Sequence, residues 1–357
     1  MRAGLVALLI GLPAPIAAET RLAAEDAALM QEALVTTADE FILPAYEAQS
    51  QAAQKLVDSL SAYCAEEDGI GAAEQSFADL FLAWQRSSIV SIGPITEAEG
   101  PMRVQLWPDP KGFSARATRA ARASADPGLL EPGGLTGRSI ALTNLTALEG
   151  LIFEPIEPAS YGCDLATAIA TFQAELSSDL VAAWTPGSEY RALFDTAAIG
   201  NERYGSVDDQ IRDLLAGAVV YTDRLRKFKL LRGLGTAPGQ ARPERTEAVA
   251  SGLGRQSIIV AFETIADFYE TPFGLFDMAP EIGGTLDYFV LSQTASSVAT
   301  DVALMDESLT TIAAADGPMA ADLRRMADTV LYHEQYLKFG FLSGIGLTAG
   351  FTAADGD

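Results

Sequence analysis

Two oxygen-bearing side chains, Thr146 and Glu149, stand three residues apart in a stretch whose apolar residues repeat with a helical period. Those apolar residues are Leu142, Leu145, Leu148 and Ile152. Since helix positions three apart lie on one side, Glu149 borders the buried face, where a carboxylate must be paired or hydrogen-bonded. Glu149 is therefore either a cleft carboxylate that contacts a ligand or a cation, or a structural acceptor for Arg86, Arg103 or backbone amides.

A long connection rich in proline and glycine, residues 93–137, precedes this helix and carries Arg103, Trp107 and Asp109. Arg103 could hold a carboxylate by a bidentate pair, and Trp107 could bind an aromatic or cationic group. Alternatively, both residues are structural: Trp107 packs the connection against the helices and Arg103 anchors it there.

The length of this connection predicts a ligand-binding cleft. A segment so long must fold over some surface, and the helices on either side of it border the same junction. We expect Arg103 to neutralise Glu149 there or to share a ligand with it. The candidate cleft residues are Thr146, Glu149, Arg103, Trp107, Arg86 and Asp109.

The chain has a single histidine, His333, which excludes every site that needs two histidine ligands, including the zinc pair of metallopeptidases. His333 lies on an apolar stripe between Val330 and Leu337, a position that favours a buried, hydrogen-bonded residue over a ligand. We predict no catalytic residues and no tight divalent transition-metal site at Thr146 and Glu149.

Because the candidate ligands are carboxylate oxygens, the ion that they would suit is a hard cation. Glu149 supplies a single oxygen, and Asp109, Asp355 and Asp357 could add others if the connection and the C-terminus fold over the cleft. Such a site would hold iron or another hard cation weakly, and no other cofactor is expected.

Helical periodicity dominates the chain, and the sequence lacks alternating, β-branched strand patterns. We expect a long helix over 20–62 that Pro44 ends or kinks. Further helices are expected over 72–92, 138–153, 165–184, 207–231, 245–269, 281–312 and 319–339. Four helices before about residue 190 and four after it predict an all-α fold with two four-helix bundles side by side, 19–190 and 191–357, in an arrangement that suggests duplication.

Residues 1–18 are typical of a secretory signal peptide. Arg2 precedes an apolar run, Leu5–Leu12, and small residues lead to a cleavage point expected after Ala18 or Ala17. The run is too short to span a bilayer, and no later stretch is apolar enough to do so. We therefore expect a periplasmic protein that is not inserted in the membrane after signal cleavage.

The composition is both acidic and apolar. The chain carries 24 Lys+Arg against 48 Asp+Glu, a formal charge of −24, and 49% of its residues are hydrophobic. So much apolar material can bury a large core, which excludes a disordered chain. The negative charge repels phosphate groups, so it argues against nucleic-acid binding and against docking on an anionic membrane.

Cys64 and Cys163 are the two cysteines. We expect Cys64 near the end of the first helix and Cys163 at the start of the fourth, where antiparallel packing would bring them together. In an oxidising compartment they would then form a disulfide. The alternative, a nucleophilic thiol with His333 as its base, has no support in either local sequence.

The connection and its flanks resemble the imelysin-like proteins, which are secreted, all-helical bacterial proteins associated with iron uptake. The resemblance is carried by Trp84-Gln85-Arg86, Gly93-Pro94, Arg103-Val104-Gln105-Leu106-Trp107-Pro108-Asp109 and Lys111-Gly112. Matches of the same kind occur at 41–46, 147–149, 151–153 and 350–357, so the resemblance covers the chain from about residue 40 to 357.

The family's signature, Gly-x-His-x-x-Glu, is degenerate here. Glu149 keeps its place, but Thr146 stands at the histidine position and Asn144 at the glycine position. Of the Trp-Arg-Ser-Gly that many members carry, only Ser251-Gly252 remains. A metallopeptidase, the activity once attached to the family, would therefore lack its metal ligand.

The resemblance implies a role in iron acquisition at the cell envelope, as a binding or accessory module rather than a catalyst. Iron-uptake components of the envelope are the partners that it implies. Two alternatives remain: a metallopeptidase-type hydrolase, which the Thr146 substitution disfavours, and a non-catalytic envelope interaction protein whose cleft has lost its ligand.

Overall fold

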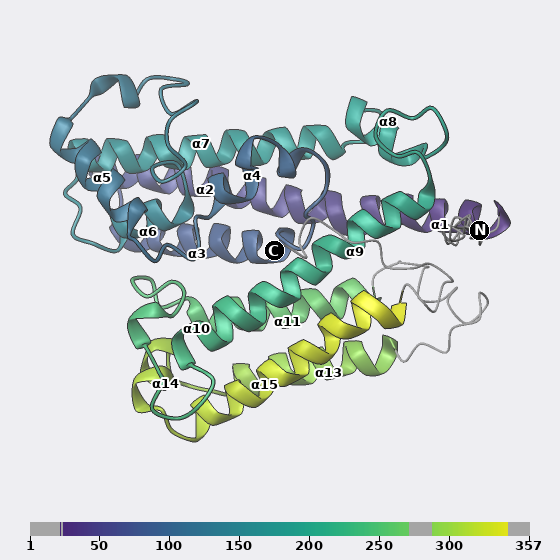
Figure 1. Ribbon diagram of the computed structural model, residues 1–357. Helices are drawn as coiled ribbons and strands as arrows, with labels where there is room; N and C mark the ends of the chain where they lie inside the picture. The colour runs from purple at the N-terminus through teal and green to yellow at the C-terminus, as the bar shows by residue number, and fades with distance from the viewer. Residues whose placement is uncertain (1–21, 23, 271–287, 342–357) are drawn as a thin grey trace, which may run out of the picture.

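The structure is a computed structural model that describes residue 22 and residues 24–270 and 288–341. The expected signal peptide, Asp355 and Asp357 lie outside these residues. The described chain is all helical, as predicted, and contains no strand. Figure 1 shows its helices in two groups, one from the N-terminal half of the chain and one from the C-terminal half. The duplication of these halves remains a prediction.

The N-terminal group is built around a long helix that packs against two others. Its main elements are α1 (Ala24–Thr37), η1 (Ala38–Ile42), α2 (Leu43–Cys64), α3 (Ile70–Ser87), α6 (Leu145–Ile152), α7 (Tyr161–Trp184) and α8 (Glu189–Asp195). Helix α2 lies between α3 and α7. The chain stays helical through Pro44, which falls in the first turn of α2 directly after the π-helical turn η1, where the missing N–H of proline is tolerated.

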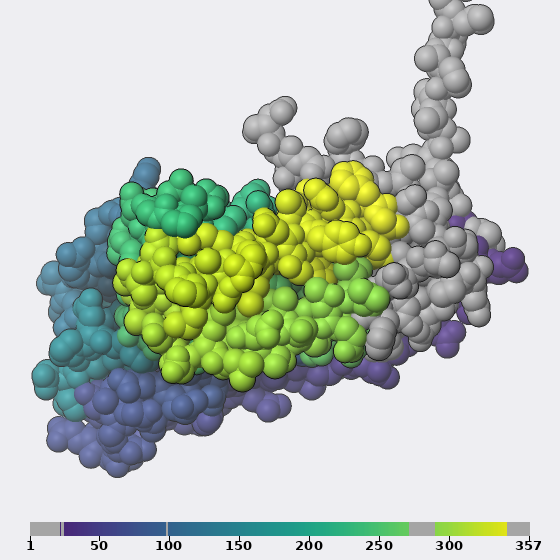
Figure 2. Space-filling view, turned by 90° about the horizontal axis from the view of Figure 1, so that it is seen from below, coloured from purple at the N-terminus to yellow at the C-terminus, as the bar shows by residue number. Residues whose placement is uncertain are grey.

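The C-terminal group follows the same principle, with α11 against α13 and α15 against α9. Its elements are α9 (Val207–Arg224), η4 (Leu225–Leu230), α10 (Leu231–Leu234), η5 (Pro243–Arg245), α11 (Gly254–Glu270), α13 (Tyr288–Ala303), α14 (Leu309–Ala315), α15 (Pro318–Gln335) and η6 (Tyr336–Phe341). Figure 2, seen from below, shows this green-to-yellow half lying over the purple and blue N-terminal half.

The connection 93–137, for which the sequence predicts no helix of its own, folds into short helices. It contains η2 (Gly93–Glu99), α4 (Gly100–Val104), α5 (Phe113–Ser124) and η3 (Pro127–Leu129). Its prolines and glycines mark the ends of these short helices: Pro94 and Pro101 lie in first turns, and Gly112 precedes α5 with a positive φ of 60°. The connection therefore positions side chains as a folded element does.

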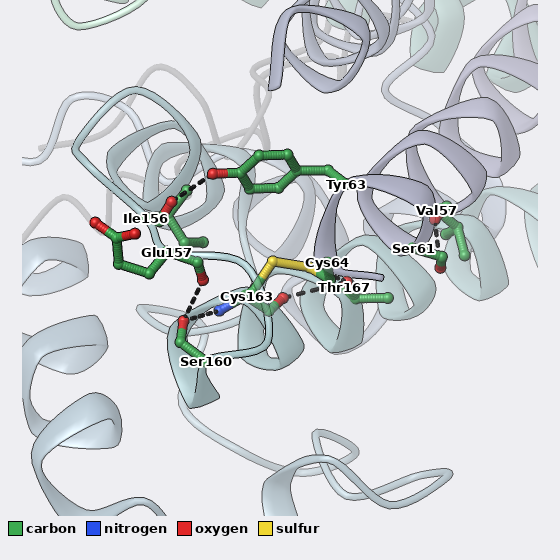
Figure 3. Close-up of a disulfide and its surroundings, with 9 residues drawn as sticks. All are labelled: Val57, Ser61, Tyr63, Cys64, Ile156, Glu157, Ser160, Cys163 and Thr167. Atoms are coloured by element: carbon green, nitrogen blue, oxygen red, sulfur yellow. Dashed lines mark hydrogen bonds between the residues drawn. A yellow bond between two sulfur atoms is a disulfide. The ribbon is translucent and has the colours of Figure 1, made fainter. Parts of the chain in front are cut away.

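A disulfide joins Cys64 and Cys163, the pairing expected from the sequence. Their Cα atoms are 5.7 Å apart, Cys64 being the last residue of α2 and Cys163 lying in the first turn of α7. Figure 3 shows the neighbouring Tyr63 hydroxyl donating to the carbonyl of Ile156, at 2.5 Å. The bond and this contact hold the end of the antiparallel α2–α7 pair.

One hydrophobic core runs through both groups. Phe41 of η1 meets Phe268 of α11 edge to face, with 6.3 Å between ring centroids, and α3 packs against α11. No helix in the described ranges has the length and apolar character needed to cross a bilayer. The two groups thus meet along a packed seam, and the candidate site lies on it.

Candidate functional site

A cavity of about 400 Å³ lies where the two groups meet, and we call it the junction cavity. Its wall is formed by α3 and the segment after it, by η2, α4 and the segment after α4, by α9 and η4, and by residue 247. The aromatic residues on it are Trp84, Trp107, Tyr221 and Phe228. Thr96, Glu99 and Met102 are wall residues that are also exposed, and they form the cavity mouth.

A buried polar network forms one part of this wall. Lys229 and Glu247 make an ion pair, and their side chains are 9% and 2% exposed. Lys229 Nζ also donates to Gln85 Oε1 at 2.6 Å, which ties the C-terminal group to α3. Gln105 Nε2 donates to Glu247 Oε1 at 2.8 Å, and Trp84 Nε1 donates to Gln105 Oε1 at 3.0 Å. Every member of the network thus has a partner in another segment.

The electrostatics of this network favour the charged pair. Burial opposes ionisation of Glu247, but Lys229 and hydrogen bonds from Ser257 and Gln105 outweigh it and lower the pKa of that carboxyl. For Lys229, burial lowers the pKa of the amine and the attraction of Glu247 opposes this shift. A buried pair supported in this way fixes position rather than supplying a free acid or base.

Glu149 lies beside this network and is 8% exposed. Its Oε1 accepts from the backbone N–H of Ser251 at 2.9 Å and from the Ser251 hydroxyl at 2.7 Å. Burial raises the pKa of Glu149, the Ser251 hydrogen bonds oppose this, and the nearby negative charge of Glu247 adds to it. The two segments that stand for the family motifs in the sequence are therefore in direct contact across the seam.

Two residues of the degenerate motif, Asn144 and Thr146, make structural hydrogen bonds. Asn144, at the glycine position, caps α6 by accepting from the N–H groups of Thr146 and Ala147 at 2.8 and 3.1 Å. Thr146, at the histidine position, donates its hydroxyl to the Leu106 carbonyl at 3.2 Å. The Thr146 bond attaches the start of α6 to the connection beside Trp107.

Of the six predicted cleft residues only Trp107 lines the junction cavity, and the others make contacts elsewhere. Arg86 pairs with Asp267 of α11 and lies over the Phe41 ring, 5.1 Å from its centroid. Asp109 caps α5, accepting from the N–H groups of Phe113 and Ser114 at 2.8 Å each.

Arg103 contacts the connection itself. Its Nη1 is 3.5 Å from the Arg138 carbonyl, which accepts its hydrogen bond, and its own carbonyl accepts from Gln173 at 2.8 Å. Among the described residues no ion pair joins Arg103 to Glu149; Ser251 holds that carboxylate instead. Of the partners expected for Glu149, the structure therefore places backbone amides there.

His333 is fully buried in α15, in agreement with its place on an apolar stripe. Its ring stacks on Tyr269, and its Nδ1 is 3.3 Å from the Tyr269 hydroxyl. Burial lowers the pKa of His333 to about 4, so the ring is neutral at physiological pH. Its surroundings are those of a core residue.

Lys229, Glu247 and Arg224 were not predicted as site residues, and Gln85 and Gln105 were named only within the blocks that carry the family resemblance. The signal for Arg224 and Lys229 was present on the last turns of the stripe over 207–231, where charged residues stand among apolar ones at helical spacing. Tyr221, Arg224 and Phe228 are three and four residues apart and share the cavity-facing side of α9 and η4.

The described residues include no group of three or more His, Cys, Asp and Glu that could hold a metal ion. Glu149 is engaged by Ser251 and Glu247 by Lys229, so within this part of the chain each supplies carboxylate oxygens that already have partners. The oxygen ligands expected from Asp355 and Asp357 belong to residues that the structure does not describe.

Comparison with known proteins finds solved structures of the same fold and a family model that matches the sequence. A solved imelysin-like protein from Psychrobacter arcticum 273-4 superposes with a TM-score of 0.73 at 16% identity, over 93% of this chain and 99% of that one. A protein from Parabacteroides distasonis ATCC 8503, described as an iron-regulated protein A precursor, gives 0.71 at 13% identity, over 92% and 98%. No curated protein matches by sequence. The family model for imelysin matches residues 42–336, and the chain therefore belongs to the imelysin family.

Proposed function

We propose that the protein is exported and has a binding or accessory role in iron acquisition at the cell envelope. Membership of the imelysin family and the likeness to an iron-regulated protein support the link to iron. The partners in this proposal are iron-uptake components of the envelope, and the location is the periplasm.

The observation that carries the binding role is the pairing of the two buried carboxylates at and beside the junction cavity, Glu247 and Glu149. Lys229 neutralises Glu247, and Ser251 holds Glu149, so the polar groups keep a shaped space open between the two helix groups. Catalysis by acid and base would need a group left available for proton transfer to a substrate. The arrangement supports a binding module better than a hydrolase.

Iron itself would be held weakly in this proposal. Thr146 replaces the histidine that would give a nitrogen donor, and its hydroxyl is bonded to Leu106. Glu149 offers one carboxylate, which suits a hard cation but does not by itself make a tight site. The metallopeptidase alternative lacks the ligand set that a catalytic zinc needs.

Deletion of the gene in its host, followed by growth with an iron chelator, tests the proposal. The deletion strain should grow more slowly than the parent under iron limitation and equally well with added iron. The full gene should restore growth, whereas a version lacking residues 1–18 should not, because the protein would stay inside the cell. Equal growth of the deletion strain and the parent under iron limitation would contradict the role in iron acquisition.

A peptidase assay on the purified protein separates binding from catalysis. An unstructured protein substrate should remain intact with and without added Zn²⁺ or Fe²⁺. Cleavage that a chelator removes and zinc restores would establish the hydrolase instead.

A further inference from the structure

The junction cavity combines an apolar, aromatic wall with two cations and one carboxylate behind its mouth, and a second carboxylate, Glu99, is exposed at the mouth. Trp107, Tyr221 and Phe228 supply flat apolar surface. The charged wall residues behind the mouth are Arg224, Lys229 and Glu247, and Glu247 balances only one of the two cations.

Arg224 is the cation left over. Its Nη2 donates to the Trp107 carbonyl at 3.0 Å, and within the described ranges no ion pair joins it to a carboxylate. Burial lowers the pKa of Arg224, and the more distant Glu247 opposes this only in part. A half-buried guanidinium with spare donors is stabilised by an anion that brings its own charge into the cavity.

Trp107 adds a second, independent feature. Its indole Nε1 is buried and meets no acceptor among the described residues. Arg232 lies over the same ring, with its Cζ 5.7 Å from the centroid, and has no carboxylate partner in the described chain. Since Nε1 has almost no accessible surface, the ring contributes apolar surface rather than a donor to the cavity.

We propose that the junction cavity binds a small organic monocarboxylate with a flat apolar body. The carboxylate pairs with Arg224, whose fork of donors fits two oxygens, and the body lies among Trp107, Tyr221 and Phe228. This inference rests on the binding role proposed above but not on its link to iron.

The charge and the walls argue against other ligand classes. A bare cation would meet uncompensated Arg224, and the one buried carboxylate on the wall is already paired with Lys229. An inorganic anion would satisfy Arg224 but leave the aromatic surface in contact with water. One negative charge matches Arg224, the cation behind the mouth that has no carboxylate partner in the described chain.

Tryptophan fluorescence and calorimetry on the full protein test the proposal. Two of the three tryptophans, Trp84 and Trp107, lie on the cavity wall, so binding should change the emission. The probes are benzoate, indole-3-acetate, the neutral benzamide and acetate. Either aromatic carboxylate should bind at least about tenfold more tightly than benzamide, which lacks the charge, and than acetate, which lacks the body.

Substitutions locate the site. Arg224→Gln should weaken binding of the aromatic carboxylate by about 10- to 100-fold, the effect of losing a charge-assisted hydrogen-bonded pair, and Arg224→Lys should recover part of it. Arg119→Gln, an exposed arginine of α5 on the other side of the connection, is the matched control and should bind like wild type.

The proposal is overturned if neither aromatic carboxylate binds below about 10 mM, or if benzamide binds as tightly as benzoate. Both results come from the wild-type protein, so they stand even where a variant fails to fold. Failure here with a growth defect in iron-limited deletion cells would leave the role in iron acquisition intact, and the reverse pattern would leave this ligand class intact.

Discussion

The contacts of Glu149 bear on the two roles that the sequence leaves open for it, a cleft carboxylate that contacts a ligand and a structural hydrogen-bond acceptor. The carboxylate is buried, and it accepts hydrogen bonds from the backbone N–H and the hydroxyl of Ser251, on the opposite helix group. Its energetic role is therefore to join the seam rather than to neutralise Arg103. The residue type was visible in the sequence, whereas its partner lies 102 positions away and became visible only when the fold brought the two segments together.

Substitutions at Glu149 should reflect the loss of these two bonds. Glu149→Ala should lower the free energy of unfolding by about 1–3 kcal/mol, because the Ser251 donors lose their acceptor. Glu149→Gln keeps an acceptor oxygen in place and should cost less. Urea unfolding followed by circular dichroism measures both. A larger loss in a Ser251→Ala background than in wild type would show that the partner has been misassigned.

The burial of His333 leads us to predict how the folding stability depends on pH. Its pKa in the folded protein is about 4, below the ordinary 6.5, because burial disfavours the charged ring. As the pH falls, the unfolded chain therefore takes up the proton first, so stability declines from about pH 6.5 and the loss is complete below about pH 4. The full contribution is on the order of 3 kcal/mol.

The groups around His333 determine which substitution can serve as the control for this experiment. Tyr269 stacks on the ring, and Glu334, the next residue, pairs with Lys338 at 3.0 Å. His333→Phe keeps an aromatic ring in the apolar site and should flatten the stability profile between pH 6.5 and 4. Urea unfolding at several pH values measures it; parallel profiles for wild type and variant would refute the assignment.

At the scale of elements, the disulfide makes the clearest prediction. It closes a loop of 99 residues between the end of α2 and the start of α7. Removing both sulfurs with Cys64→Ser and Cys163→Ser should lower the free energy of unfolding by about 4–5 kcal/mol in the chain-entropy model. The unreduced protein should show no free thiol after denaturation; two reactive thiols would contradict the bond.

The long helices could be predicted from the sequence because each buries a stripe with a 3.6-residue period. The predicted 165–184 and 319–339 correspond to α7 and to α15 with η6. Helix α5 was missed because its exposed face carries three arginines and its ends are marked by glycine and Ala125, so the local pattern is that of a polar loop. Its helical form depends on Asp109 as a cap and on packing against α6 and α7.

The site was less predictable than the fold. The sequence singled out Trp107 and Glu149, but Lys229 and Glu247 stand in the charged segments 224–232 and 242–247, where nothing distinguishes a buried charge from an exposed one. The periodicity of a single sequence indicates which residues are buried. It does not indicate which polar side chains are partners, because partners lie on segments that are distant in the sequence. Gln85 and Gln105, which complete that network, look like ordinary polar positions in the sequence.

For the whole molecule, the seam between the helix groups depends on the buried pair. Lys229→Met should lower the free energy of unfolding by about 3–5 kcal/mol, because Glu247 is left charged and buried without a partner. The double variant with Lys229→Met and Glu247→Gln should recover much of this loss, since no charge then remains unpaired. Chemical unfolding of the three proteins measures it; equal losses in the single and double variants would show that the pair itself is not the cause.

The exposed Glu99 at the cavity mouth has a consequence for the rate of ligand entry. Arg86–Asp267, Lys229–Gln85 and Glu149–Ser251 join the two helix groups along the seam. The exposed wall residues are Thr96, Glu99 and Met102, so an anion that enters there passes the Glu99 carboxylate. It approaches a protein whose sequence carries a charge of −24. Dissolved salt screens that repulsion, so the association rate of a carboxylate should rise with ionic strength, the opposite of electrostatic steering.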